Sequence, residues 1–95
     1  MKENSSIITA VDKERRFEEI SFVLLNKLEK LEINSINPLI LNNIVNTYIS
    51  KIILFFDKKF LPPVTYQLVL YLRKNNLVGD ILRPLLDDVI DQNES

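Results

Sequence analysis

The segment "DDVID" places three carboxylates, Asp87, Asp88 and Asp91, within about one turn of a predicted helix. Carboxylates grouped in this way could hold a magnesium ion or share a proton in acid–base catalysis. The alternative is a solvated acidic helix end, where the three charges oppose the helix dipole and a basic neighbour would stabilise them. We expect this alternative, with no metal bound and no catalysis.

Composition excludes the other common kinds of chemical site. The 95 residues include no histidine, no cysteine and one glycine. The chain therefore cannot supply a Ser/His/Asp or Cys/His catalytic set, a zinc site built from the usual ligands, or a glycine-rich phosphate loop. We expect a protein that is not an enzyme and that has no catalytic residues, no cofactor and no metal.

Two pairs of cations, Lys58–Lys59 and Arg73–Lys74, could contact the phosphates of a nucleic acid. The formal net charge is −1, from 12 basic and 13 acidic residues, so no overall field would hold a polyanion. The two pairs also fall at opposite ends of a predicted helical hairpin, which prevents a continuous basic stripe. Nucleic-acid binding is therefore an alternative that we do not favour.

Apolar residues recur three or four positions apart over most of the chain, which is the periodicity of amphipathic helices. Hydrophobic residues make up 46% of a length that suits one domain with its own core. We predict a single, compact, all-α domain over residues 1–95, with loose ends at about 1–10 and 92–95. Its four helices are predicted at about 12–31, 37–59, 63–75 and 78–91.

Asp12 is the expected N-cap of the first helix. The charged run "DKERRFEE" that follows is interpreted as a solvated helical face, with Asp12/Arg16 and Arg15/Glu19 as opposite-sign pairs at spacing four. The apolar side of this helix is predicted to hold Phe17, Ile20, Leu24, Leu28 and Leu31.

The second helix is predicted from "SINP", where Asn37 caps the helix and Pro38 takes the first helical position. Lys51 is the only charged residue from 33 to 56, but five asparagines and a proline interrupt this stretch, so we expect no membrane span. The apolar residues of this helix leave only a narrow polar strip, and we expect cover on most of its sides. The strip runs through Asn43, Asn46, Ser50 and Asp57.

The double proline in "FFDKKFLPPVTY" is predicted to be a corner inside one domain. A helix that is apolar on two sides needs cover from the helices on both sides of it in the sequence. Pro62-Pro63 therefore joins antiparallel helices, since proline is tolerated at the first position of a helix.

Asp80 is the expected N-cap of the fourth helix, which places Pro84 early in that helix. A start near Leu77 would instead put the proline in the helix interior and kink it. The N-terminal sequence "MKENSSIITAVDKERR" lacks the apolar stretch of a secretory signal, so we expect a cytoplasmic location.

The stretch "VTYQLVLYLRKNNLVGDILRPLL", residues 64–86, combines an aromatic and apolar helix, a basic break and a short apolar helix. In this pattern it resembles the last two helices of bacterial effector-associated domains. The resemblance implies a small death-fold-like adaptor module that brings defence or signalling proteins together. It covers about a quarter of the chain, rests on apolar spacing and transfers no functional residue.

A compact helical domain without catalytic equipment is commonly used for contact with other proteins. We therefore predict a non-catalytic interaction or adaptor module that self-associates as a homo-oligomer or docks a protein partner through an apolar face of the second and third helices. The alternative is a small helical subunit of an RNA-guided nucleoprotein complex. The predicted partner-binding residues are Tyr48, Phe55, Phe56, Phe60, Tyr66 and Tyr71. The predicted charged flank consists of Lys58, Lys59, Arg73, Lys74, Asp87, Asp88 and Asp91.

Overall fold

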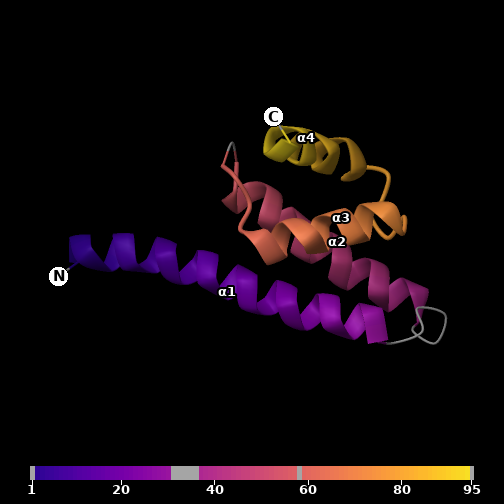
Figure 1. Cartoon of the computed structure of the whole chain (residues 1–95), viewed down its shortest axis with the longest axis horizontal. Coiled ribbons are helices and arrows are strands. Elements are labelled where there is room, and N and C mark those ends of the chain that lie inside the picture. Colours follow the sequence, from indigo (N-terminus) through magenta and orange to yellow (C-terminus); the bar gives the residue numbers. More distant parts are fainter. Residues whose placement is uncertain (1, 31–36, 58, 95) are drawn as a thin grey trace.

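The computed structural model describes residues 2–30, 37–57 and 59–94, and for residues 2–10 it describes the backbone alone. These residues form four α-helices and no strand (Figure 1). The helices are α1 (Lys2–Lys30), α2 (Pro38–Phe55), α3 (Pro63–Lys74) and α4 (Arg83–Glu94). The prediction of a compact all-α fold with four helices is confirmed.

The short helix α3 lies at the centre of the molecule. It packs closely against α1 and α4, and α4 also packs against α2. Because α3 has neighbours on several sides, its apolar residues Leu68, Val69 and Leu72 have no exposed surface. The longest helix is α1, and its first turns extend beyond the ends of the other three helices (Figure 1).

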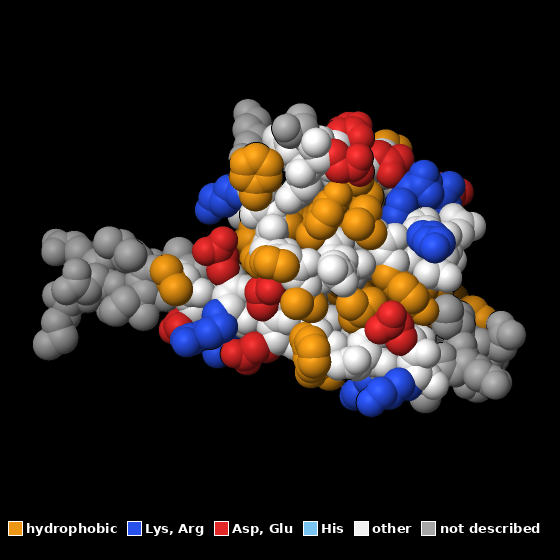
Figure 2. Space-filling view, in the orientation of Figure 1, with side chains coloured by type: hydrophobic (Ala, Val, Ile, Leu, Met, Phe, Trp, Pro, Cys, Tyr) orange, Lys and Arg blue, Asp and Glu red, His pale blue; other side chains and the backbone are white. Residues whose placement is uncertain are grey.

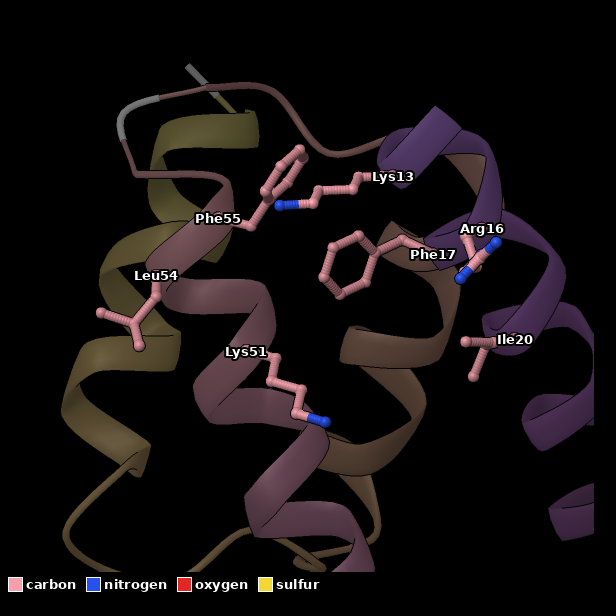
Figure 3. A pocket seen from close by; sticks show the side chains of 7 residues that line it. All are labelled: Lys13, Arg16, Phe17, Ile20, Lys51, Leu54 and Phe55. Carbon is pink, nitrogen blue, oxygen red and sulfur yellow. The ribbon is translucent and has the colours of Figure 1, made fainter. Parts of the chain in front are cut away.

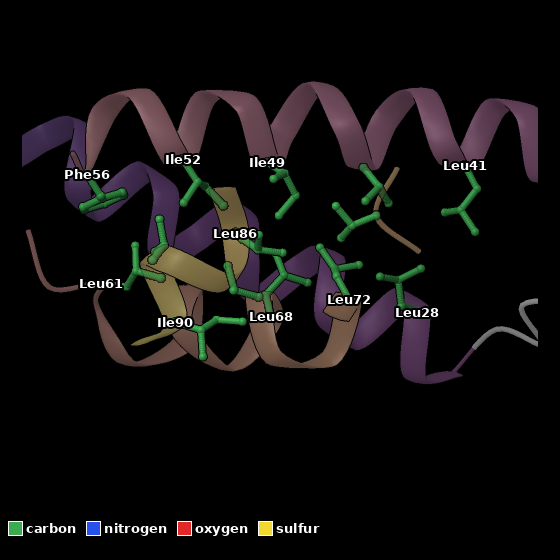
Figure 4. Packing of buried hydrophobic residues seen from close by; sticks show 14 residues of the cluster. Leu28, Leu41, Ile49, Ile52, Phe56, Leu61, Leu68, Leu72, Leu86 and Ile90 are labelled. Atoms are coloured by element: carbon green, nitrogen blue, oxygen red, sulfur yellow. The ribbon is translucent and has the colours of Figure 1, made fainter. Parts of the chain in front are cut away.

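The hydrophobic core draws on all four helices and on the links before and after α3 (Figure 4). One row of α2, with Val45, Ile49 and Ile52, is fully buried, and Phe56 directly after the helix is equally buried. Burying a side chain of this size contributes about 1.5–3 kcal/mol relative to leaving it in water. The row therefore supplies a large share of the stability of the fold.

The expectation that α2 is covered on most sides is wrong. Leu39, Ile40 and Ile44 are more than half exposed, because α2 packs closely against α4 but not against α1 or α3. In the described part of the chain, α2 is the one helix long and apolar enough to cross a membrane. That is weak evidence for a span, since core helices of globular proteins pass the same test.

The first helix begins at Lys2, so Asp12 lies inside it and is not its N-cap. Residues 2–10, which we expected to be loose, form its first turns. Arg15 pairs with Asp12, one turn earlier, in place of the two predicted pairs at spacing four. The first five residues of the helix, KENSS, carry no apolar side chain, which is why the apolar pattern did not reveal where it begins.

The start of α2 agrees with the prediction, whereas its end comes earlier. Asn37 Oδ1 accepts a hydrogen bond from the Leu39 N–H at 2.9 Å, and Pro38 is the first helical residue. The helix ends at Phe55 and not near residue 59, with the N–H of the C-cap residue Phe56 donating to the Ile52 carbonyl oxygen.

Pro62 and Pro63 form the predicted corner, as the N-cap and the first residue of α3. The Tyr66 N–H donates to the Pro62 carbonyl oxygen at 2.9 Å, so α3 starts directly from the corner. Just before the corner, the Leu61 N–H donates to Asn93 Oδ1 at 2.8 Å. This bond attaches the corner to the end of α4.

The fourth helix begins at Arg83, so Asp80 is not its N-cap. Residues 80–82 form a turn instead, in which the Gly79 carbonyl oxygen accepts from the N–H groups of Leu82 and Arg83 at 3.1 and 3.0 Å. Pro84 falls in the first helical turn, where its missing N–H removes no helical hydrogen bond. The helix therefore starts at neither of the two predicted positions, Asp80 or Leu77.

Asn46 attaches α2 to the turn between α3 and α4. Its Oδ1 accepts a hydrogen bond from the Gly79 N–H at 2.9 Å. A Cβ on Gly79 would lie 3.3 Å from this same oxygen, which is tighter than an ordinary contact. Glycine is therefore favoured here by the close approach of a side chain, since its φ is not positive.

Replacing Asn46 with alanine is expected to lower the free energy of unfolding by about 1–3 kcal/mol, because the half-buried Gly79 N–H would lose its acceptor. Asn43→Ala removes an amide from the exposed side of the same helix and is expected to change the free energy by at most about 0.5 kcal/mol. Urea denaturation followed by circular dichroism measures both. Equal effects of the two substitutions would contradict the assigned role of Asn46.

Candidate functional site

A groove runs between α1 and α2, because these two helices do not pack closely together. Phe17 reaches from α1 across the intervening space towards α2 (Figure 3). Its ring centroid lies 5.2 Å from those of Phe55 and Phe56 and 5.8 Å from that of Tyr48. Aromatic pairs attract each other over such distances. The cluster of four rings therefore sets the separation of the two helices.

The α1–α2 groove is defined by eight apolar or aromatic side chains that form its floor. They are Phe17, Ile20, Val23 and Leu24 from α1, and Ile44, Tyr48, Leu54 and Phe55 from α2. The two main hollows have volumes of about 500 and 440 Å³ and share Ile20. Ile20 and Ile44 keep 45% and 51% of their surface exposed, so the floor is open to solvent.

Basic side chains stand along the rim of the groove. Lys13, Arg16, Lys27 and Lys51 line the two hollows together with one carboxylate, Glu19. Among the residues that the structure describes, none of these four cations takes part in an ion pair. The excess of positive charge gives the groove a local field although the whole chain is nearly neutral.

A polar network next to the groove ties α1 and α2 to α3. Ser21 and Thr65 are fully buried, and Ser21 Oγ donates to Thr65 Oγ1 at 3.2 Å. The Tyr48 hydroxyl lies 2.9 Å both from Ser21 Oγ and from the carbonyl oxygen of Phe17. Within the described residues, every buried side-chain nitrogen or oxygen has a partner. A fully satisfied network of this kind holds the helices in one arrangement.

Glu18 caps the N-terminus of α3 from a different helix. Its Oε1 accepts from the Thr65 N–H at 2.7 Å and from Thr65 Oγ1 at 2.9 Å, and its Oε2 accepts from the Val64 N–H at 3.2 Å. Pro62, which occupies the N-cap position, has no side-chain acceptor. Glu18 therefore takes the role that a serine or aspartate cap usually has, and its charge also interacts favourably with the α3 dipole.

The aromatic residues predicted to bind a partner do not form one surface. Tyr48 and Phe55 line the groove. Phe56 has no exposed surface and belongs to the core, whereas Phe60 is 72% exposed in the link before α3.

The two remaining predicted aromatics, Tyr66 and Tyr71, lie on α3 beside a separate hollow to which Leu25 of α1 contributes. The Tyr71 hydroxyl donates to the Leu28 carbonyl oxygen at 3.3 Å. Tyr71 therefore attaches α3 to α1, and both rings lie outside the groove.

The predicted acidic flank is divided as well. Arg73 Nε donates to Asp87 Oδ1 at 2.7 Å, so this ion pair joins α3 to α4 and supplies the basic neighbour that the aspartates were expected to need. The same hydrogen bond raises the pKa of Arg73. Asp88 and Asp91 are exposed on α4. In the described part of the chain, no three side chains of His, Cys, Asp or Glu come together as a metal site.

Of the predicted cations after α2, Lys59 does not form one basic surface with Arg73 and Lys74 at the end of α3. Lys59 Nζ lies 5.3 Å from the ring centroid of Phe55, a cation–π contact. Lys74 is exposed at the end of α3, and Lys58 lies outside the described residues. The predicted cations thus have separate local neighbours.

Sequence patterns did not single out Val23 and Ile44, and they assigned Ile20 to the apolar side of the first helix. The structure instead places the small polar Ser21 in the buried face of α1, while Ile20 turns towards the groove. One signal was present in the sequence: "ISFVLL" has more apolar residues than a single helical stripe can hold.

No protein-family model matches this chain, and comparison with curated proteins and with solved structures finds no match either. The resemblance of residues 64–86 to effector-associated domains therefore stays a prediction. A function for this chain has to be argued from the groove and its surroundings.

Replacing Glu18 with alanine is expected to lower the free energy of unfolding by about 1–3 kcal/mol, because two N–H groups of α3 would lose a charged acceptor. Glu14→Ala removes an exposed carboxylate from the same helix and is expected to cost at most about 0.5 kcal/mol. Urea denaturation measures both variants. A loss for Glu18→Ala no larger than that for Glu14→Ala would show that the cap contributes nothing to stability.

The stability of the fold is expected to fall at alkaline pH because of Tyr48. Burial raises the pKa of its phenol above the usual 10.0, the Ser21 hydrogen bond opposes this rise, and the charge of Glu18 adds to it. The unfolded chain therefore ionises at lower pH than the folded one. The contribution of the Tyr48 phenol to the free energy of unfolding is complete below pH 10.0. It is lost as the pH rises through the higher pKa that the phenol has in the folded chain.

Tyr48→Phe is expected to cost about 1 kcal/mol at neutral pH through the lost hydrogen bonds and to make the alkaline fall in stability shallower. Urea denaturation curves recorded at about pH 8 and about pH 11 give the comparison. An equally steep fall in both proteins would show that another group causes it.

Proposed function

We propose that this chain is a small, non-catalytic helical interaction module that docks a protein partner in the α1–α2 groove. The observation that carries the proposal is a continuous apolar floor, contributed by two helices and open to solvent in the single chain. Contiguous exposed apolar surface with a charged rim is typical of protein interaction sites. A composition without histidine or cysteine supports a role other than catalysis.

The groove is shaped before any partner binds. The ring of Phe17 packs against the rings of α2, and the Tyr48 hydroxyl is anchored by Ser21 and the Phe17 carbonyl group. A preorganised site loses little conformational entropy on binding, so more of the contact energy remains as affinity. Aromatic floor residues such as Tyr48 and Phe55 are of the type that commonly dominates binding energy.

The proposed surface differs from the predicted one in one helix. We expected the docking face on the second and third helices, but Leu68, Val69 and Leu72 of α3 are in the core. The exposed apolar side chains that adjoin α2 belong to α1 instead. Docking on α1 and α2 keeps the predicted class of function and moves its location.

Nucleic-acid binding through the predicted cations has less support. Arg73 is paired with Asp87, and Lys59 lies over the Phe55 ring. The rim cations of the groove surround apolar and aromatic side chains that suit a protein surface better than a phosphate backbone.

A photoreactive benzoylphenylalanine in place of Ile44 is expected to form an adduct of one discrete mass when the full chain is irradiated in the cells that produce it, because a docked partner would cover this side chain. The same probe in place of Gln67, which is exposed on α3 outside the groove, is the matched control and is expected to give no discrete adduct. Denaturing electrophoresis and mass spectrometry measure the products. The proposal fails if probes at both Ile44 and Val23 give no discrete adduct.

A further inference from the structure

We infer that the occupant of the α1–α2 groove is the outer face of α4 of a second copy of this chain. The inference rests on the proposed function, because it names the partner that the groove accepts. It is carried by two surfaces of one molecule that complement each other in charge and in apolar side chains. One is the basic-rimmed groove, and the other is the exposed face of α4.

The charge of the groove disfavours a symmetric pairing of two grooves. Four rim cations face one carboxylate, Glu19. Bringing two such rims together would place like charges opposite each other, which opposes association. The groove therefore needs an occupant with acidic side chains next to apolar ones.

The outer face of α4 has this composition. Ile81, in the turn that leads into the helix, is 87% exposed, and Leu85 is 46% exposed. Asp88 follows Leu85 at helical spacing and is exposed. Figure 2 shows acidic side chains gathered over α4, with apolar side chains beside them. Apolar residues could meet the groove floor while the carboxylates reach the rim.

A copy cannot fill its own groove with its own α4. The helix lies on the other side of α2 from α1 (Figure 3), and its inner residues Leu86, Val89 and Ile90 are buried in the core. The contact must therefore join different copies, with the groove of one on α4 of the next. In such head-to-tail contacts a groove stays free at one end of the assembly and an α4 face at the other, so they produce open chains, or rings where the two ends meet.

An anionic membrane surface would also complement an apolar floor with a basic rim. The floor of the groove, however, consists of hollows between two helices, and a convex helix face fills a hollow better than a flat lipid surface does. Binding to lipid is accordingly an outcome that the test must separate from self-association.

The test is a charge exchange between the two surfaces, using the full chain. Lys51 and Asp88 are exposed, and within the described residues neither is in an ion pair, so substitution of either leaves the fold intact. Light scattering behind a sizing column is expected to show wild-type mass rising above 11.1 kDa with loading concentration. Lys51→Glu and Asp88→Lys are each expected to weaken association at least about tenfold, and the double variant to restore it.

Glu29→Lys is the matched control, because it makes the same change of charge as Asp88→Lys at an exposed site outside both surfaces. It is expected to associate as the wild type does. Circular dichroism of every variant checks that the helices are intact. Vesicles of phosphatidylglycerol, with vesicles of phosphatidylcholine as the neutral reference, test the lipid surface directly.

The inference is overturned if the wild type stays at 11.1 kDa at every concentration, or if association survives both single substitutions unchanged. It is also overturned if the wild type stays monomeric and binds the anionic vesicles. In either monomeric case, an Ile44 adduct with the mass of a different protein would leave the proposed function standing. If no adduct forms at Ile44 either, both the inference and the proposed function are wrong.

Discussion

The contact between the Glu18 carboxylate and the first turn of α3 is the interaction on which the rest of the structure depends. A proline at the N-cap gives α3 its direction after the corner but offers no acceptor for the free N–H groups of the helix. Glu18 provides that acceptor from α1. The same contact therefore completes one helix and fixes the position of another.

The polar network that continues from this contact also explains why α2 is bare on one side. Ser21 and Thr65 lie side by side, and the Tyr48 hydroxyl approaches them from α2. Aromatic rings of α1 and α2 meet beside this network and keep the two helices from closing on each other. The groove is thus a product of the same residues that hold the fold together. Its shape and the stability of the fold are linked, so a large change on its floor affects both.

Local sequence signals predicted the parts of the fold that depend on neighbouring residues. The Asn37 cap, the two prolines of the corner and the number of helices all follow from short segments. The start of α1 was missed because its first five residues, KENSS, carry no apolar side chain. The turn before α4 was missed because its position depends on Asn46, which is distant in the sequence.

The candidate site was less predictable for a related physical reason. An apolar residue has the same chemistry in a core and on a groove floor, so only the three-dimensional arrangement separates Ile49 from Ile44. Aromatic residues were a partial guide, since Tyr48 and Phe55 line the groove while Phe56 is buried. The charged rim could not be recognised, because its members come from two helices that the sequence does not place side by side.

The cap on α3 has a consequence for how this protein is made. Synthesis proceeds from the N-terminus, so α1 is synthesised before residues 64 and 65. Until then Glu18 has no helix N-terminus to bind, and the Ser21 hydroxyl lacks its hydrogen-bond partner Thr65. The longest helix of the molecule must therefore wait, with its apolar side uncovered, until most of the chain has been translated. During that interval the apolar side of α1 is exposed surface of the kind that promotes aggregation of unfinished chains.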